Sequence, residues 1–136
     1  MEQTSEATGE TEVAAVVVSR TLPYPVRTVW EVLMTTDGSE ALLGPGAQLG
    51  SKGESWRSHD GREGVVRSFH PLEQIRFTWR LRESAHPTMV DVRLVPADDQ
   101  ATEFRIEHSK LPPHADRAWL SDRWEAAIDR IESECV

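Results

Sequence analysis

The chain has 136 residues, a formal net charge of −8 and one cysteine. That length suits a single domain with one hydrophobic core and leaves no room for two independent cores. An acidic chain without a basic cluster is a poor candidate for binding nucleic acid or an anionic membrane, so these partners are excluded. Residues 1–12 hold four glutamates and no basic residue, which predicts a disordered acidic tail before a single domain over residues 13–136.

The chain carries no targeting or membrane signal. Its longest apolar run is far shorter than the ~20 residues of a membrane-spanning helix, and no signal-peptide pattern opens it. Cys135 is the only cysteine, which excludes an internal disulfide and a Cys-rich zinc module. We therefore expect a cytoplasmic protein that does not insert into membranes.

The first third of the chain predicts one strand and two short helices. Residues 13–22 are largely β-branched and predict a strand. Residues 26–33 carry an amphipathic stripe that predicts a helix. Asp37 and Glu40 resemble a capping box that opens a second helix, which ends at residues 44–46 and is followed by a strand.

The middle of the chain predicts an antiparallel meander. Asp60-Gly61 is a two-residue hairpin signal, and the later segments alternate between one apolar and one charged face. No segment offers room for a crossover helix, so successive strands are joined by hairpins. Besides the strand expected after residues 44–46, the expected strands cover residues 54–59, 62–70, 74–82, 87–95 and 101–109.

Residues 115–133 predict one long helix with a buried stripe through Leu120, Trp124 and Ile128. The apolar face of the sheet needs a cover, and this helix is the only long amphipathic element. The fold class is therefore α+β, with a curved antiparallel sheet of about seven strands in the order β-αα-β6-α wrapped around the C-terminal helix.

Five short motifs carry a family resemblance: Pro25–Trp30, Asp60-Gly61 with Gly64–Val66, Phe77–Trp79, Ala101–Phe104 and Arg123–Ile131. In their order and spacing they resemble the family of activator of heat-shock protein 90 ATPase homologue-like proteins. That family belongs to the superfamily of START and birch-pollen-allergen-like domains (SRPBCC). The resemblance covers about Val13–Glu134 and implies the helix-grip fold.

The chain departs from the family pattern at three places. The family usually has a Trp near Leu42-Leu43, a Gly pair where this chain has Lys52-Gly53, and a Gly where Arg123 precedes Trp124. These departures leave the fold intact and concern the shape of the cavity mouth.

The predicted site is a ligand cavity between the sheet and the C-terminal helix. Large inward aromatic side chains with only Thr88, Thr102 and His108 as polar groups are typical of a small-molecule site. The same side chains could simply fill the core, and the family resemblance favours the cavity. The expected cavity residues are Trp30, Leu33, Leu43, Phe77, Trp79, Val90, Val92, Phe104, Ile106, His108, Trp124 and Ile128.

His108 is the one histidine expected on the inward face, where a neutral imidazole could exchange a hydrogen bond with a ligand. Alternatively, it is a strand-end histidine bonded to backbone or water. The other four histidines are expected to be solvated: His59, His70, His86 and His114.

No pattern in the chain points to a metal or a covalent nucleophile. There is no metal-ligand spacing, no nucleophile elbow and no phosphate loop before a helix. No catalytic residue, metal or cofactor is therefore expected. Trp119 could stack with Arg123, belong to a partner surface or pack against the edge of the sheet.

Three functions remain open at this stage. The first is non-catalytic binding of a small hydrophobic molecule, such as a lipid, a polyketide or an aromatic metabolite. The second, implied by the family resemblance, is a chaperone-associated interaction module. The third, implied by helix-grip relatives, is a cyclase- or hydratase-like enzyme with His108 as general acid or base, and it ranks last because no second catalytic group accompanies that residue. The expected partners are a small hydrophobic ligand and, as the family resemblance implies, a chaperone, with the chain a monomer or a homodimer.

Overall fold

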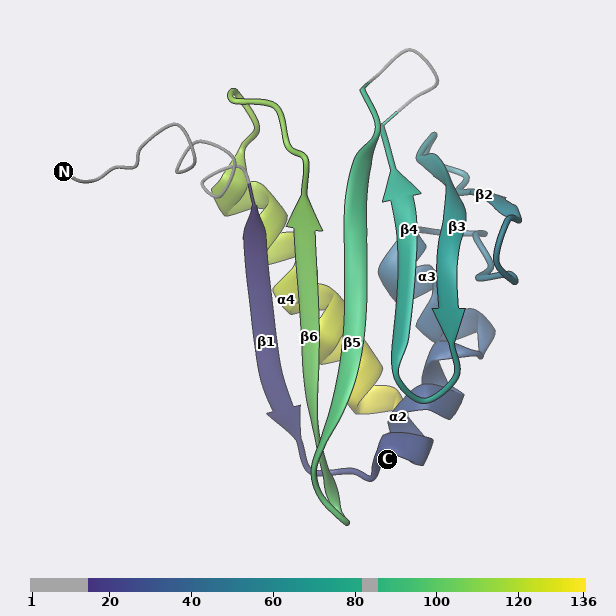
Figure 1. Ribbon diagram of the computed structural model, residues 1–136, viewed down its shortest axis with the longest axis vertical. Coiled ribbons are helices and arrows are strands. Elements are labelled where there is room, and N and C mark those ends of the chain that lie inside the picture. Colours follow the sequence, from purple (N-terminus) through teal and green to yellow (C-terminus); the bar gives the residue numbers. More distant parts are fainter. Residues whose placement is uncertain (1–14, 82–85) are drawn as a thin grey trace, which may run out of the picture.

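The computed structural model describes residues 15–81 and 86–136, in which three helices cover one face of an antiparallel sheet (Figure 1). This confirms the predicted α+β class and the sheet wrapped around a long C-terminal helix. The predicted acidic tail lies outside the described residues. In chain order the elements are β1 (Val16–Leu22), α2 (Val26–Leu33), α3 (Thr36–Leu43), β2 (Ser55–Arg57), β3 (Glu63–His70), β4 (Gln74–Trp79), β5 (Thr88–Asp98), β6 (Ala101–Ser109) and α4 (Arg117–Glu134).

Within the described ranges the sheet has six strands, in the spatial order β1-β6-β5-β4-β3-β2, so the predicted seven is wrong. The missing strand is the one expected after Gly46. In that segment the backbone N–H of Leu49 donates to the side-chain oxygen of Ser39 at 3.2 Å, and Gly53 has φ +93°. The segment therefore bonds to α3 and turns, instead of extending along a neighbouring strand.

Several element boundaries differ from those predicted. A hairpin joins β2 to β3 at Asp60-Gly61, with Gly61 at φ +96°, but its loop is longer than the two predicted residues, because β2 has only three residues and ends at Arg57 while β3 begins at Glu63. β4 ends at Trp79, three residues before the predicted end of this strand at residue 82, and Leu81 beyond it is 49% exposed. β5 continues past Pro96 to Asp98 through a register shift in its pairing with β6.

The predicted capping box of the second helix is wrong. Thr35 is the N-cap of α3, and its side chain accepts a hydrogen bond from the N–H of Gly38 at 3.1 Å. Asp37 therefore lies inside the first turn. Glu40 accepts a hydrogen bond from the N–H of Gly46 at 2.9 Å instead, which holds the loop that ends the helix.

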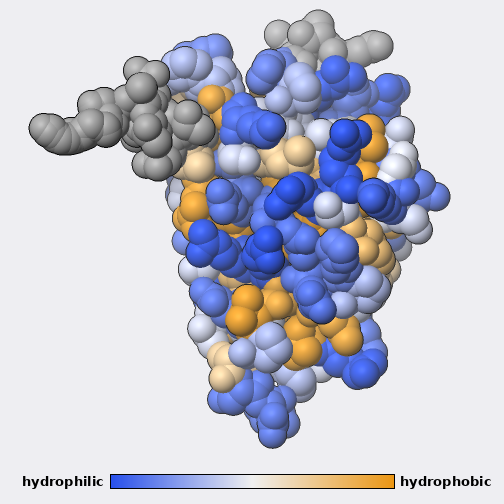
Figure 2. Space-filling view, in the orientation of Figure 1, coloured by the Kyte–Doolittle hydropathy of each residue, from blue (hydrophilic) through white to orange (hydrophobic). Residues whose placement is uncertain are grey.

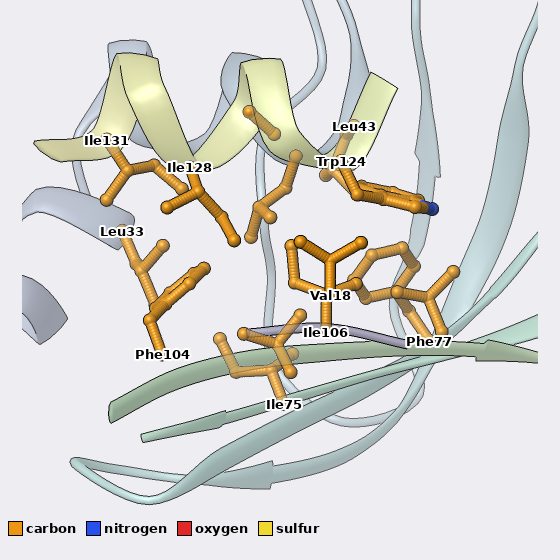
Figure 3. Close-up of a cluster of buried hydrophobic side chains, with 14 of the residues drawn as sticks. Val18, Leu33, Leu43, Ile75, Phe77, Phe104, Ile106, Trp124, Ile128 and Ile131 are labelled. Atoms are coloured by element: carbon orange, nitrogen blue, oxygen red, sulfur yellow. The ribbon is translucent and has the colours of Figure 1, made fainter. Parts of the chain in front are cut away.

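Core side chains fill the space between the middle of α4 and the sheet. Trp124, Ile128 and Ile131 extend from α4 toward the inward rows of the sheet, which include Phe77 and Phe104 (Figure 3). All five side chains are fully buried. The opposite face of the sheet is largely hydrophilic with scattered hydrophobic residues (Figure 2), in agreement with the predicted alternation.

A single arginine connects α4 to β1. The guanidinium of Arg20 lies 2.8 Å from Glu125, 2.6 Å from Asp129 and 3.2 Å from Glu132. These carboxylates lie on successive turns of α4. Each exposed pair contributes little by itself, but three partners around one guanidinium fix the position of the helix along the strand.

The two tryptophans of α4 test this description of the core. Trp124 is fully buried, whereas Trp119 is 46% exposed on the same helix. We expect Trp124→Ala to lower the free energy of unfolding by about 3–5 kcal/mol, because it leaves a cavity under the helix. The matched variant Trp119→Ala should cost under about 1 kcal/mol. Urea unfolding measures both, and equal losses would contradict the packing described here.

Candidate functional site

Four residues form a buried hydrogen-bond chain from α4 to β4. The indole N–H of Trp124 donates to Nδ1 of His108 at 3.2 Å. Nε2 of His108 lies 2.7 Å from Oγ1 of Thr88, whose hydroxyl donates to the carbonyl of Trp79 at 2.6 Å. Because an indole nitrogen can only donate, Nδ1 must be unprotonated and Nε2 must carry the proton. The chain therefore fixes one tautomer of the imidazole.

This arrangement keeps His108 neutral, with both of its ring nitrogens hydrogen-bonded. The side chain is fully buried. Burial, and to a smaller extent the positive charge of Arg123, lowers its pKa to about 4. Both alternatives predicted from the sequence, a hydrogen bond to a ligand and a bond to backbone or water, are therefore wrong, because the partners of His108 are the side chains of Thr88 and Trp124. Neither ring nitrogen is left to transfer a proton to a bound molecule.

Two arginines stack on the aromatic rings beside this chain. The guanidinium carbon of Arg123 lies 5.6 Å from the ring centroid of Trp79 and 5.1 Å from that of Trp124. The guanidinium carbon of Arg62 lies 5.6 Å from the ring of Trp79 and 5.7 Å from that of Trp119. Such contacts stabilise a cation that is partly removed from water. Trp119 therefore stacks with Arg62 and not with Arg123, the partner considered from the sequence.

One carboxylate accompanies the two arginines. Asp60 forms an ion pair with Nη1 of Arg62 and accepts a hydrogen bond from Ser58. Burial raises the pKa of Asp60, but the hydrogen bond from Ser58 and the charge of Arg62 lower it below its ordinary value. Arg123 donates through Nη2 to the carbonyl of Leu42 at 3.3 Å, and burial, followed by the charge of Arg62, lowers its pKa to about 10.

A pocket of about 500 Å³ begins where the hydrogen-bond chain ends, because Trp79 and Thr88 belong to its lining. Its other walls come from Arg80 and Leu81 after β4, from His86 before β5, from the loop before α4 and from the first turn of α4. The lining is mostly apolar, which is typical of small-molecule sites. It consists of Trp79, Arg80, Leu81, His86, Thr88, Leu111, Pro112, His114, Ala115, Asp116, Trp119 and Leu120.

The structure places the twelve predicted cavity residues in two groups, and all twelve are buried. Trp79 lines the pocket, and His108 is one hydrogen bond away from it through Thr88. The remaining ten lie in the packed core: Trp30, Leu33, Leu43, Phe77, Val90, Val92, Phe104, Ile106, Trp124 and Ile128.

Of the other polar groups expected to face inward, Thr88 lines the pocket, whereas Thr102 donates to the carbonyl of Tyr24 at 2.8 Å. The four remaining histidines are exposed, as predicted. Most of the pocket walls were missed, because they lie in loops where no periodic pattern marks a side chain as inward.

Among residues 15–81 and 86–136, no group of three or more His, Cys, Asp or Glu side chains is placed to hold a metal ion. None of the helices in that described part of the chain is long and apolar enough to cross a membrane.

The neutral state of His108 predicts a pH dependence of stability. A histidine in the unfolded chain has a pKa of about 6.5, so the unfolded state binds more protons than the folded state below that pH. Stability should therefore fall between pH 7 and pH 4, by about 3 kcal/mol from this residue, given its folded pKa of about 4. Carboxylates also titrate in this range, so we compare the protein with His108→Gln. The difference in unfolding free energy between the two should shrink by that amount, and a constant difference would contradict a neutral His108.

Solved structures of low sequence identity share this fold. DynU16, a protein of the dynemicin biosynthetic locus, is 21% identical with a TM-score of 0.74, and the match covers 88% of this chain and 46% of that one. This chain thus spans about half the length of that relative. The Aha1 dimer from Colwellia psychrerythraea is 17% identical, with a TM-score of 0.73 and coverage of 89% and 95%. An HSP90 activator from Plasmodium falciparum is 13% identical, with the same TM-score and the same coverage.

No curated protein matches the chain by sequence. The family model described as Activator of Hsp90 ATPase homolog 1-like protein matches residues 23–135. This match runs from the residue after β1 to the residue after α4 and includes every motif on which the resemblance was based. The chain therefore belongs to the family of Activator of Hsp90 ATPase homolog 1-like proteins.

Proposed function

We propose that this protein binds a small, largely apolar molecule without transforming it. The binding site is the pocket between the first turn of α4 and the ends of β4 and β5. The observation that carries this proposal is a mostly apolar pocket of about 500 Å³ at the edge of an otherwise packed core. Pockets of roughly 300–1,000 Å³ with few polar groups suit drug-sized ligands.

The walls of this pocket provide a driving force for binding. Leu111 and Leu120 are buried, but Leu81 and Trp119 are about half exposed although both line the pocket. A ligand that covers these two side chains removes apolar surface from water, which favours association. Their exposure in the free protein is therefore consistent with a site that closes on a ligand.

The relatives are compatible with this proposal without identifying the ligand. DynU16 belongs to a biosynthetic locus, which agrees with a role next to small-molecule chemistry. Lipids, polyketides and aromatic metabolites all have the apolar surface that the pocket would cover. We place the protein in the cytoplasm, as a monomer or a homodimer.

A chaperone-associated role is the second candidate. It is favoured by the family and by the similarity to an HSP90 activator. The half-exposed Trp119 would be a natural anchor for a protein partner. This candidate predicts that the purified protein binds an HSP90-type chaperone and raises its ATP turnover, with Trp119→Ala weakening both effects.

A cyclase- or hydratase-like activity has the least support from the geometry. General acid or base catalysis needs a group that can exchange a proton with the substrate. Both nitrogens of His108 are bonded within the protein, so this residue contributes to structure and not to proton transfer.

Filling the pocket tests the proposed function. Ala115 lines the pocket, whereas the nearby Ala118 is exposed and does not belong to its lining. We expect the neutral fluorescent probe N-phenyl-1-naphthylamine to bind the protein, Ala115→Trp to weaken binding about tenfold or more, and Ala118→Trp to change it less than about twofold. Fluorescence titration gives the dissociation constants.

Two results would contradict the proposed site: a probe that does not bind, or equal affinities in the protein and in Ala115→Trp. Thermal unfolding of each variant, with and without the probe, shows whether the folded protein is the binding species, because a ligand of the folded state raises the melting temperature.

A further inference from the structure

Three buried N–H donors next to the pocket have no acceptor in the protein. They are Nε1 of Trp79 and the Nε atoms of Arg62 and Arg123. Among the described residues only one other buried side-chain nitrogen lacks a partner, Nε of Arg76 on a different part of the sheet. Buried donors are rarely left unpaired, because the missing hydrogen bond is costly. We name Trp79, Arg62 and Arg123 the donor cluster.

The donor cluster lies against the wall of the pocket. Trp79 is 5% exposed and lines the pocket. The guanidinium carbons of Arg62 and Arg123 each lie 5.6 Å from the centroid of its ring. Arg62 also stacks on Trp119, a second lining residue. Displacing the half-exposed ring of Trp119 would therefore open Arg62 to a molecule in the pocket.

The donor cluster also has unused hydrogen-bonding capacity and an excess of positive charge. Arg62 engages Asp60 through Nη1, and Arg123 engages the carbonyl of Leu42 through Nη2. Asp60 supplies one negative charge against two guanidinium groups. The pKa of Arg123 is lowered only to about 10, so its guanidinium is cationic at pH 7.

The charged groups of the surrounding lining already have partners within the protein. Asp116 is the acidic residue of the lining, and its carboxylate already accepts the N–H of Trp119 as the N-cap of α4. Arg80 of the lining is paired with Glu63. The N-terminal end of α4 adds a partial positive charge to the same side of the pocket.

We propose that the ligand is an apolar acid, a molecule with a hydrophobic body and one anionic oxygen group. This inference rests on the proposed function. The apolar body occupies the pocket against Trp119, Leu120 and Leu111. The anionic group accepts hydrogen bonds from Arg62 and from Nε1 of Trp79, which pairs buried donors and balances the excess charge. Arg62 is the specificity-determining residue of this arrangement.

A matched pair of probes tests this proposal. The probe 8-anilinonaphthalene-1-sulfonate has the ring system of N-phenyl-1-naphthylamine and carries one additional sulfonate. Without a cationic partner this charge would weaken binding, because it must leave water. We expect the anionic probe to bind about tenfold more tightly than the neutral one, and Arg62→Gln and Trp79→Phe each to reduce or abolish this preference. The control Arg57→Gln alters an exposed arginine outside the pocket and should leave the preference unchanged.

The neutral probe reports in each variant whether the pocket is still folded, so a lost preference can be separated from a lost structure. Equal affinities of the two probes for the unmodified protein, or a preference that survives both Arg62→Gln and Trp79→Phe, would overturn the anionic ligand and leave the proposed function intact. Binding of neither probe would overturn both.

Discussion

The rest of the structure depends on the buried hydrogen-bond chain through His108. Trp124 on α4, His108 on β6, Thr88 on β5 and the carbonyl of Trp79 on β4 are joined by donors that each have one acceptor. If α4 slid or rotated, at least one buried polar group would lose its partner, which is strongly unfavourable. The chain therefore fixes the helix over the sheet and marks the boundary between the packed core and the pocket.

This boundary separates structure from proposed function. On the core side, a neutral imidazole with both nitrogens occupied adds no chemistry, and apolar packing continues along α4 to Ile131. On the pocket side, Trp79 presents its ring to two arginines whose donors are not all used. The two sides share one residue, Trp79. The residues that stabilise the fold therefore also position the indole group that we propose to bind the ligand.

The sequence was sufficient for elements with a regular period. β6 runs over the predicted residues 101–109, and the stripe on α4 faces the sheet as expected. It was insufficient where tertiary hydrogen bonds determine the conformation of a segment or where loops form the walls of the pocket. The segment after Gly46 follows a bond between Ser39 and Leu49 instead of pairing as a strand. The pocket walls and the stacking of Arg62 on Trp119 join residues that are far apart in the chain, and no local pattern relates them. Two departures from the family pattern also meet in space: Arg123 stands where the family usually has Gly, and it donates a hydrogen bond to the carbonyl of Leu42, near which the family usually has Trp.

The central claim is that His108 is a neutral structural group one hydrogen bond away from the pocket, through Thr88. A long-range ¹H–¹⁵N correlation spectrum of its imidazole ring at pH 7, recorded with and without saturating N-phenyl-1-naphthylamine, tests this claim most directly. We predict a proton on Nε2 alone in both spectra, with a larger shift of the indole resonance of Trp119 than of either imidazole nitrogen. A charged ring, a proton on Nδ1, or an imidazole whose resonances move more than those of Trp119 would contradict this account.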